Sequence, residues 1–346
     1  MGADGAVPGA GRHDGPGGSR EAPRHVVTVR ALVTGGNGFV ARWAIQAMLQ
    51  RGWTITAGII GDPPPKDVLS EEERASVIWL PLDVTRQSDV AEVVDRAAAD
   101  AVLHLAAISH VPDATSNPGY AYEVNTVGTV RLLTEVRRHR VAGTADPIVL
   151  VIGSAEQYGR HEINEMPLHE GMEQRPLTLY AASKAAQEVA ALQAYRSDGV
   201  RVICTRSFNH SGIGHGSHFL LPSLITRALA LPGRGGVLQI GNGDTVRDYL
   251  HVRDAVDAYL ALFEHGVTGE AYNVSSGEGV SVRALAVAVL DKLGVEAEIT
   301  SSAALARPVD VPIQVGSNSK LRHATGWAPR RTRDDIINDL IHAATF

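Results

Sequence analysis

Residues 34–41 read TGGNGFVA, and this stretch decides the fold. It joins the short β-rich run HVVTVRALV to FVARWAIQAMLQRG, whose apolar residues recur at helical spacing. Gly35 and Gly38 permit a tight turn and a close approach of a pyrophosphate to backbone N–H groups, and a helix N-terminus adds its positive dipole end. The stretch therefore predicts a dinucleotide-binding turn of the G-x-x-G-x-x-A form, with Ala41 in place of a third glycine.

Strand-like and helix-like segments alternate from this turn to about residue 206. The strand-like segments are near-continuous apolar runs, which is typical of a parallel sheet covered on both faces. The sequence predicts an α/β fold, a doubly wound parallel sheet of the Rossmann type with a smaller α+β substrate-binding lobe. The expected parts are a disordered tail at 1–25, a dinucleotide-binding domain at 26–206 with returning segments around 244–276, and the substrate lobe at 207–243 and 277–346.

Composition excludes several classes of protein. The first 18 residues include seven glycines and lack the apolar core of a signal peptide, which predicts a flexible tail. No apolar run approaches the roughly 20 residues that span a bilayer, so we expect no membrane. The net charge of −6 without a basic stripe argues against nucleic acid as a partner. The single cysteine, Cys204, predicts a buried strand thiol and fits a cytoplasmic location.

The ends of the second and third predicted strands bear on the dinucleotide. The segment AGIIGDPPPK offers Asp62 but no arginine, which favours NAD over NADP while leaving both open. Asp83, in LPLDV, is a candidate for binding the adenine amino group; the alternative is an ordinary loop or helix-capping carboxylate.

The stretch YAASK, residues 180–184, carries the candidate chemistry. On a helix, Tyr180 and Lys184 share one face, and the alanines around them leave room for a ligand. An ammonium and a positively charged nicotinamide would stabilise the phenolate and lower the tyrosine pKa from about 10. Such a tyrosine can exchange a proton with an alcohol while hydride moves. The alternative is a surface Tyr–Lys pair of the kind that is common on helices.

The stretch VIGSAEQYG places Ser154 and Glu156 at the carboxyl edge of the sheet, where ligands bind in such folds. A Ser154 hydroxyl can bridge a substrate hydroxyl and Tyr180, although a strand-end cap is the alternative. A carboxylate at Glu156 can remove a proton alpha to a ketone.

These residues and the motifs LHLAA, EVNTVGT, SFNH, VRDYLHVRDAVDAY and AYNVSSG occur in the order of a known family. Over about residues 27–345 the chain resembles the extended short-chain dehydrogenases/reductases, the NAD-dependent epimerase/dehydratase family, which act on nucleotide-diphosphate sugars. AAISHVPDATSNPGY is similar to GDP-mannose 4,6-dehydratases, and SFNHSGIGHG is similar to GDP-4-keto-6-deoxymannose reductases.

The resemblance implies a role for each site residue. Tyr180 would be the acid/base, Lys184 would bind the nicotinamide ribose, and Ser154 and Glu156 would complete the catalytic group. The residues implied in dinucleotide binding, besides Tyr180 and Lys184, are Gly35, Asn37, Gly38, Phe39, Val40, Asp83, Val84, Leu105, Ala106, Ala107 and Asn125. Those implied in binding a nucleotide-diphosphate sugar, with a GDP-hexose favoured, are Ser109, His110, Asn209, Arg247 and Arg307; an Asn turn cap and surface arginines are the alternatives. The family also implies a homodimer through a four-helix interface.

One departure from the family separates the possible reactions. Many 4,6-dehydratases place Asp before the catalytic Glu, whereas this chain has Ala155 there. We therefore favour a 4-keto reductase over a 4,6-dehydratase that uses Glu156 as base, and keep a C4 epimerase as a third hypothesis. A non-catalytic dinucleotide sensor is a different class, but such regulators usually lack the Tyr or Lys.

Four histidines lie near the loops assigned to the sugar site: His110, His210, His215 and His218. Their spacing is unlike that of a zinc site, so we expect them to be polar lining and expect no metal.

Overall fold

The computed structural model describes residues 1, 28–305 and 311–345. The expected tail and Arg307 lie outside these residues. A seven-stranded sheet with all six pairings parallel forms the centre of the molecule. Across the sheet the strands are β10 (Ala271–Val274), β6 (Val202–Ser207), β5 (Ile148–Ser154), β4 (Ala101–His104), β1 (Arg30–Thr34), β2 (Thr54–Ile59) and β3 (Ile78–Pro81). The predicted doubly wound α/β fold is confirmed.

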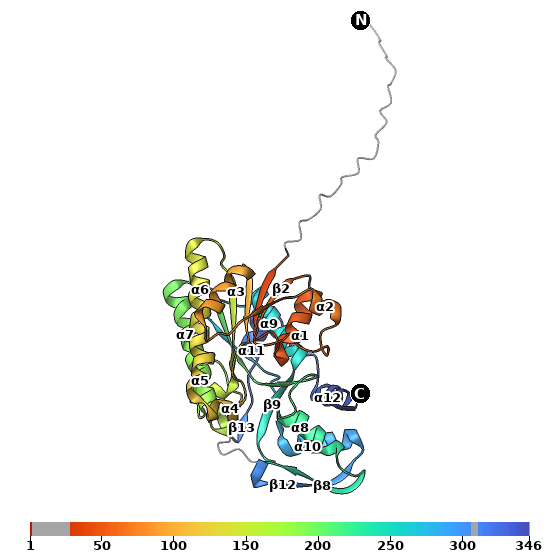
Figure 1. The fold of residues 1–346 in the computed structure, drawn as a ribbon. Coiled ribbons are helices and arrows are strands. Elements are labelled where there is room, and N and C mark those ends of the chain that lie inside the picture. The colour runs from red at the N-terminus through yellow and green to blue at the C-terminus, as the bar shows by residue number, and fades with distance from the viewer. Residues whose placement is uncertain (2–27, 306–310, 346) are drawn as a thin grey trace.

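Helices cover both faces of the sheet (Figure 1). One face carries α1 (Phe39–Gln50) and α9 (Val252–His265), and the other carries α3 (Gln87–Ala97), α6 (Gly128–Ala142) and α7 (Leu179–Asp198). Neighbouring residues of a strand point to opposite faces, so Leu32 lies in one core and Val33 in the other. Both cores are apolar, which explains the near-continuous apolar runs.

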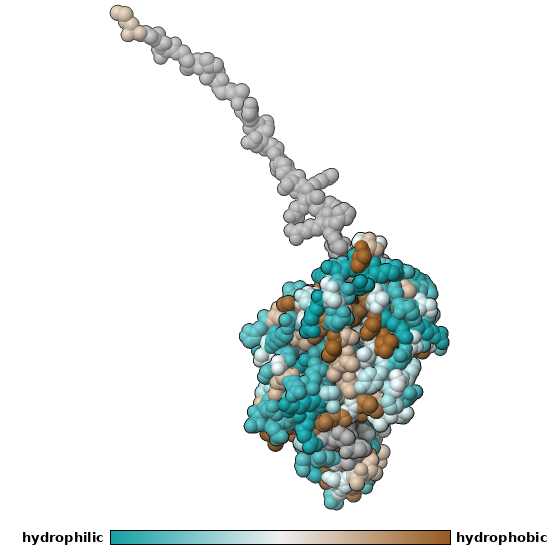
Figure 2. All heavy atoms as spheres, turned by 90° about the vertical axis from the view of Figure 1, so that its left-hand side faces the viewer, coloured by the Kyte–Doolittle hydropathy of each residue, from teal (hydrophilic) through white to brown (hydrophobic). Residues whose placement is uncertain are grey.

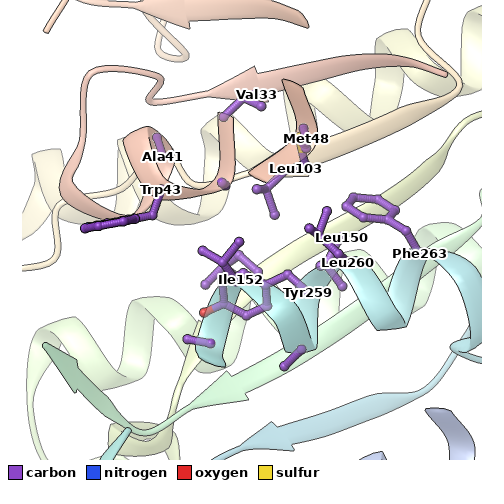
Figure 3. Close-up of a cluster of buried hydrophobic side chains, with 14 of the residues drawn as sticks. Val33, Ala41, Trp43, Met48, Leu103, Leu150, Ile152, Tyr259, Leu260 and Phe263 are labelled. Atoms are coloured by element: carbon purple, nitrogen blue, oxygen red, sulfur yellow. The ribbon is translucent and has the colours of Figure 1, made fainter. Parts of the chain in front are cut away.

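Figure 3 shows the core under α1 and α9. Val33, Leu103 and Leu150 project from three adjacent strands toward Met48 of α1 and Tyr259 of α9. All five side chains are at most 1% exposed. This packing fixes α1, and with it the turn at its N-terminus, to the carboxyl edge of the sheet.

The helical segment that contains EVNTVGT is not one continuous α-helix. Asn117 caps α5 (Pro118–Tyr122) by accepting a hydrogen bond from the Tyr120 amide. A π-helical turn, Glu123–Val127, then precedes α6. The short helices α2 (Glu71–Ala75) and α4 (Val111–Ser116) lie in the loops after β2 and β4. Cys204 is 1% exposed in β6, so the predicted buried thiol is confirmed.

The remaining segments form a smaller lobe, seen at the bottom of Figure 1. Its core lies between three helices and a parallel two-stranded sheet. These elements are α8 (Leu220–Leu229), α10 (Val282–Leu293), α12 (Arg333–Thr345), β8 (Arg234–Ile240) and β12 (Glu296–Ser301). Between the lobe and the main sheet, β9 (Val246–His251) pairs with β7 (Asn209–Ser211), β11 (Gly279–Ser281) and β13 (Ile313–Gln314), and α11 (Ser319–Thr325) packs on α9 and β10.

Candidate active site

The candidate site lies where parallel strands end together. In the sheet register, Thr34 at the end of β1 pairs with His104 at the end of β4, and Ser154 at the end of β5 pairs with Ser207 at the end of β6. The segments that follow these strands therefore meet at one edge, where ligands bind in doubly wound folds.

The TGGNGFVA turn has the backbone that the sequence predicted. Gly35 adopts φ +67°, and a Cβ there would lie 2.9 Å from Cα of Ala106, so only glycine fits between the turn and the segment after β4. Gly38 is the N-cap of α1, and no side chain caps this helix. Ala41 is 1% exposed, as close helix–sheet packing requires. An uncapped helix N-terminus at this edge fits the pyrophosphate of a dinucleotide.

Other residues predicted to bind the dinucleotide surround this turn. Asn37 donates its Nδ2 to the carbonyl of Ile60 after β2, a 2.9 Å bond that fastens the turn to the next strand. Asp83 accepts bonds from the amide and hydroxyl of Thr85, at 2.9 and 2.7 Å, and the hydroxyl bond holds the pKa of Asp83 below its usual range. The structure thus places Asp83 in a local turn as well as at the sheet edge.

Two more segments predicted to bind the dinucleotide lie near the turn. Val84 touches the start of α6, since a Cβ on Gly128 would lie 2.8 Å from its Cγ2. Leu105, Ala106 and Ala107 follow β4, and the Ala106 amide donates to Oγ1 of Thr34 at 3.2 Å. Val40 lies in the first turn of α1.

Tyr180 and Lys184 lie on α7, which begins after Thr178 caps its first turn and ends at Gly199. Lys184 is 4% exposed and donates Nζ to the carbonyl of Ile152 at 2.6 Å. Burial lowers the pKa of Lys184 to about 7. The helix predicted over YAASK is confirmed, and both side chains are buried rather than displayed on the surface.

The phenol of Tyr180 is shifted opposite to the sequence-based expectation. Burial raises the pKa of Tyr180, the hydrogen bond with the Ser154 side chain lowers it, the nearby carboxylate of Glu156 raises it, and the net value is about 12. The expected lowering also counted on a positively charged nicotinamide, so the protein groups by themselves keep this phenol protonated.

Ser154 and Glu156 are brought next to Tyr180 by a short 3-10 turn, Ala155–Tyr158. The Ser154 hydroxyl accepts from the Glu156 amide at 3.2 Å, so it caps this turn as well as meeting the phenol. Ala155 is 3% exposed and lies in an apolar cluster with Tyr158, Leu168 and Phe208.

Asn125 lies in the π-helical turn and is fully buried. Its Oδ1 accepts from the Ile108 amide at 2.8 Å, and its Nδ2 donates to the Ile108 carbonyl and to Oγ of Ser183 at 3.1 and 2.9 Å. It therefore braces the segment after β4 against the helix that holds Tyr180.

Sequence reasoning missed a buried hydrogen-bond network of polar side chains behind the site. Oγ1 of Thr34 meets Nδ1 of His104 at 2.8 Å, and Nε2 of His104 meets Oγ1 of Thr129 at 2.8 Å. Thr129 in turn donates to the Asn125 carbonyl and accepts from Gln187. Burial lowers the pKa of His104 to about 3, with Lys184 adding to the shift. The only sequence signal for this network is His104, a polar residue in the otherwise apolar strand AVLH.

Of the residues predicted to bind a nucleotide-diphosphate sugar, Ser109 and His110 follow β4 and Asn209 follows β6, at the same edge, while Arg307 lies outside the described residues. Asn209 in β7 and Arg247 in β9 are on paired strands. Arg247 is 7% exposed and donates Nη1 to the Val311 carbonyl at 2.6 Å. Ser109 is exposed, and His110 contacts Asp113 at 3.1 Å.

The four histidines near the site form ring contacts rather than a metal site. Phe39 stacks on His215 at 4.5 Å between centroids, and His110 meets His218 edge-on at 4.6 Å. Phe39, predicted to bind the dinucleotide, thus has its ring against His215 in residues 212–219, the loop between β7 and α8 that we call the substrate-side loop. Within residues 28–305 and 311–345, no three His, Cys, Asp or Glu side chains are grouped to hold a metal ion, and no helix there is long and apolar enough to cross a membrane.

Comparison with known proteins agrees with this architecture. Residues 32–340 match the family model described as GDP-mannose 4,6 dehydratase. The GDP-6-deoxy-D-mannose reductase of Pseudomonas aeruginosa is 34% identical over 309 residues, which cover 88% of this chain and 94% of the relative. The structure of RMD from Pseudomonas aeruginosa complexed with NADPH has a TM-score of 0.75 at 30% identity, covering 91% of this chain and 98% of that one. UDP-glucose 4-epimerase from Thermus thermophilus in complex with NAD has a TM-score of 0.78 at 26% identity, covering 91% and 98%.

Proposed function

Since the chain belongs to the GDP-mannose 4,6-dehydratase family of the extended short-chain dehydrogenases/reductases, we propose that it is a GDP-4-keto-6-deoxyhexose 4-reductase. Family membership leaves reduction, dehydration and epimerisation open. The observation that carries the choice is Ala155, whose methyl group is packed in an apolar cluster where many dehydratases carry an acid. The Pseudomonas aeruginosa relative that is named a reductase supports the same choice.

The protein groups suit a reduction in which they supply the proton. Bound NAD(P)H would supply the hydride to C4 of the keto sugar. The phenol of Tyr180 then donates its proton to the C4 oxygen, so that the ketone becomes an alcohol. A pKa of about 12 keeps this phenol in its acid form at neutral pH. The hydroxyl of Ser154, bonded to the phenol, is placed to hold the same oxygen.

Lys184 and Asn125 serve this reaction by position. The Lys184 ammonium is anchored on Ile152 and keeps further N–H donors for a ribose hydroxyl. Asn125 fixes the turn that faces α7 through its bonds to Ile108 and Ser183. Arg247, on the strand beside Asn209, would meet the diphosphate, because a guanidinium fork matches phosphate oxygens.

The dinucleotide choice is part of the proposal. The loop after β2 presents exposed Asp62 and no arginine between residues 60 and 67, and Lys66 pairs with Glu71. A 2′-phosphate would find no free guanidinium in this loop, which favours NADH. The Pseudomonas aeruginosa structure reported above was solved with NADPH, so the assay compares NADH with NADPH.

Assembly and location complete the proposal. The face that carries α6 and α7 displays apolar side chains among hydrophilic ones (Figure 2). Exposed apolar residues on these two helices and the turn before them are Val127, Val130, Val141, Leu179, Val189 and Tyr195. A homodimer in which these helices pair would cover them. The buried thiol of Cys204 fits a cytoplasmic location.

A specific observation also favours a second function, the 4,6-dehydratase. Glu156 lies close enough to Tyr180 to raise the pKa of the phenol, so its carboxylate could remove a proton from C5 of a 4-keto sugar. In that reaction water leaves C6, and the acid that would assist the departure is absent from position 155.

Turnover assays separate the two functions. For the reductase, GDP-4-keto-6-deoxymannose with NADH or NADPH yields a GDP-6-deoxyhexose, and GDP-mannose alone yields nothing. Glu156→Gln abolishes dehydration if that is the reaction, but it leaves reduction in place. Formation of a 4-keto-6-deoxy sugar from GDP-mannose without added dinucleotide would contradict the reductase.

A further inference from the structure

Helix α1 carries the dinucleotide turn at one end and also grips the loop on the substrate side. Trp43 donates Nε1 to the Ile213 carbonyl at 3.0 Å, and Arg42 donates Nη2 to the Gly214 carbonyl at 2.8 Å. The ring of Phe39 stacks on His215 with 11° between their planes. Three consecutive loop residues are therefore held by one helix, within its first five residues.

Arg42 connects three parts of the site. It is 8% exposed and forms an ion pair with Asp67 in the loop after β2. Its Nε also points to the Gly38 carbonyl in the dinucleotide turn, at 3.4 Å. Gly214 has φ +84°, and a Cβ there would lie 3.0 Å from Nη2 of Arg42. A buried guanidinium with these partners moves only if the turn, the β2 loop and the substrate-side loop move together.

A column of rings continues the contact into the smaller lobe. His215 stacks on Phe219 at 4.2 Å, Phe219 meets His218 at 4.3 Å, and His218 meets His110 at 4.6 Å. Phe219 is the N-cap residue of α8, whose buried side chains belong to the core of the smaller lobe.

The ring of His215, which lies between Phe39 and Phe219, is fixed and uncharged. The Nδ1 of His215 forms a 2.9 Å hydrogen bond with Oγ of Ser211, at the end of the strand that begins with Asn209. Burial lowers the pKa of His215 to about 3, so its ring stays neutral at physiological pH. A neutral ring can stack flat between Phe39 and Phe219.

We propose that Phe39, Arg42 and His215 are positioning residues that couple the dinucleotide site to the nucleotide-sugar site. A dinucleotide on the N-terminus of α1 restrains Phe39 and Arg42. These two side chains in turn restrain residues 209–219, which are β7 and the substrate-side loop. The nucleotide sugar then meets a loop that is already ordered and loses less conformational entropy on binding. The coupling is reciprocal, so each ligand raises affinity for the other. The nucleotide-sugar half of this inference rests on the proposed function, and the dinucleotide half does not.

Hydrogen exchange with the dinucleotide alone tests the coupling without any sugar. In the wild-type protein, saturating NADH or NADPH slows exchange of the amides in 209–219 by about five-fold or more, the lower range of allosteric coupling. His215→Ala, which removes the ring between Phe39 and Phe219, loses this protection while still binding the dinucleotide. His215→Phe keeps the stack and keeps the protection.

The controls decide between coupling and direct contact. His265→Ala, at an exposed histidine on the end of α9, behaves as the wild type. Protection that persists in His215→Ala means that the dinucleotide touches the loop itself, and this overturns the proposal. Unchanged exchange in the wild type overturns it as well.

Nucleotide binding separates this inference from the proposed function. The affinity for GDP rises about five-fold or more when NADPH or NADH is bound, and His215→Ala removes this increase. A wild-type protein that protects 209–219 with the dinucleotide but never binds GDP keeps the α1 coupling and contradicts the proposed substrate. GDP binding with no dependence on the dinucleotide contradicts the coupling alone.

Discussion

Tyr180 is the residue on which the proposed chemistry depends. Burial and the Glu156 carboxylate outweigh the Ser154 hydrogen bond and raise the pKa of its phenol to about 12, so the phenol stays in its acid form even at alkaline pH. Tyr180→Phe removes the proton donor but keeps the ring, so we expect kcat for keto-sugar reduction to fall about 10²- to 10⁴-fold, the usual contribution of general acid–base catalysis. The dissociation constant for NADH or NADPH should change far less than kcat, because Lys184 and the glycine turn remain in place.

Steady-state kinetics and dinucleotide titration of the purified variant measure both quantities. Tyr195→Phe on the exposed side of the same helix is the matched control and keeps the wild-type rate. A Tyr180→Phe variant with wild-type kcat would remove the mechanism.

His104 predicts a pH dependence of stability. Its pKa is lowered to about 3 in the folded protein and lies near 6.5 in the unfolded chain, so below pH 6.5 the unfolded chain binds a proton that the folded protein does not. The contribution of His104 to stability is therefore fully present above pH 6.5. It is lost as the pH falls from 6.5 toward 3, by about 1.4 kcal/mol per pH unit. His104→Gln removes this contribution.

Denaturant unfolding at about pH 7.5 and about pH 5.5 measures the difference, a range chosen to bracket the histidine pKa. The free energy of unfolding should fall less in His104→Gln than in the wild type. His265→Gln, on the surface, should follow the wild type. Equal pH dependence in the wild type and His104→Gln would show that His104 is not held neutral by the fold.

At the residue scale, the sequence showed which side chains gather but not which way each points. Spacing placed Tyr180 and Lys184 on one helical face, and strand ends placed Ser154 and Glu156 beside them. The direction of Ala155 into an apolar cluster depends on Leu168 and Phe208, which are distant in sequence. The pKa of Tyr180 depends on burial, which a helical spacing does not report.

Among the elements, the dinucleotide turn was the most predictable. Glycines between an apolar strand and an amphipathic helix predict a tight turn, which is a local conformation. The structure has this turn at Gly35 and Gly38. The π-helical turn Glu123–Val127 could not be predicted, because the helical pattern runs through it without a break. Bonds from Asn125 to Ile108 and Ser183, which come from other parts of the chain, fix that turn.

The turn carries a prediction with a matched control. Gly35 and Gly52 both have positive φ, but a Cβ on Gly35 would strike the Ala106 backbone, whereas one on Gly52 meets nothing within 4 Å. Each change to Ala costs about 1–2 kcal/mol for the left-handed backbone. We expect Gly35→Ala also to weaken dinucleotide binding by at least about ten-fold, or about 1.4 kcal/mol, because the turn must move.

Dinucleotide titration and denaturant unfolding of the two variants give both quantities. Gly52→Ala should lose stability and keep its affinity. Equal dinucleotide affinity in the two variants would contradict the assignment of this turn.

For the whole molecule, the sequence predicted the sheet and its two covered faces, and these are confirmed along with the family resemblance. The smaller lobe was less predictable. The pairing of β8 with β12 and of β7 with β9 joins segments far apart in the chain, and short strands such as Gly279–Ser281 carry no periodic signal. Long-range pairing of this kind is set by the assembled core rather than by local sequence.

The α6–α7 face predicts the oligomeric state. Val189 on α7 is 64% exposed, and a charge there would be buried unpaired in a dimer formed through this face. Val189→Lys should therefore convert the proposed homodimer to a monomer. Val267→Lys, at a 57% exposed valine after α9, should remain dimeric.

Analytical ultracentrifugation of the three proteins measures their masses. A monomeric wild-type protein, or a dimer that tolerates Val189→Lys, would contradict the proposed interface.

The central claim is that hydride goes from an added dinucleotide to C4 of a keto sugar, with the proton supplied by the chain. The most direct test follows deuterium from NADPH or NADH labelled at C4 of the nicotinamide ring. Incubated with GDP-4-keto-6-deoxymannose, the protein should place one deuterium at C4 of the GDP-6-deoxyhexose product. If GDP-mannose labelled at sugar C4 is instead converted without added dinucleotide, and its deuterium appears at C6, the protein is a dehydratase and the claim is contradicted.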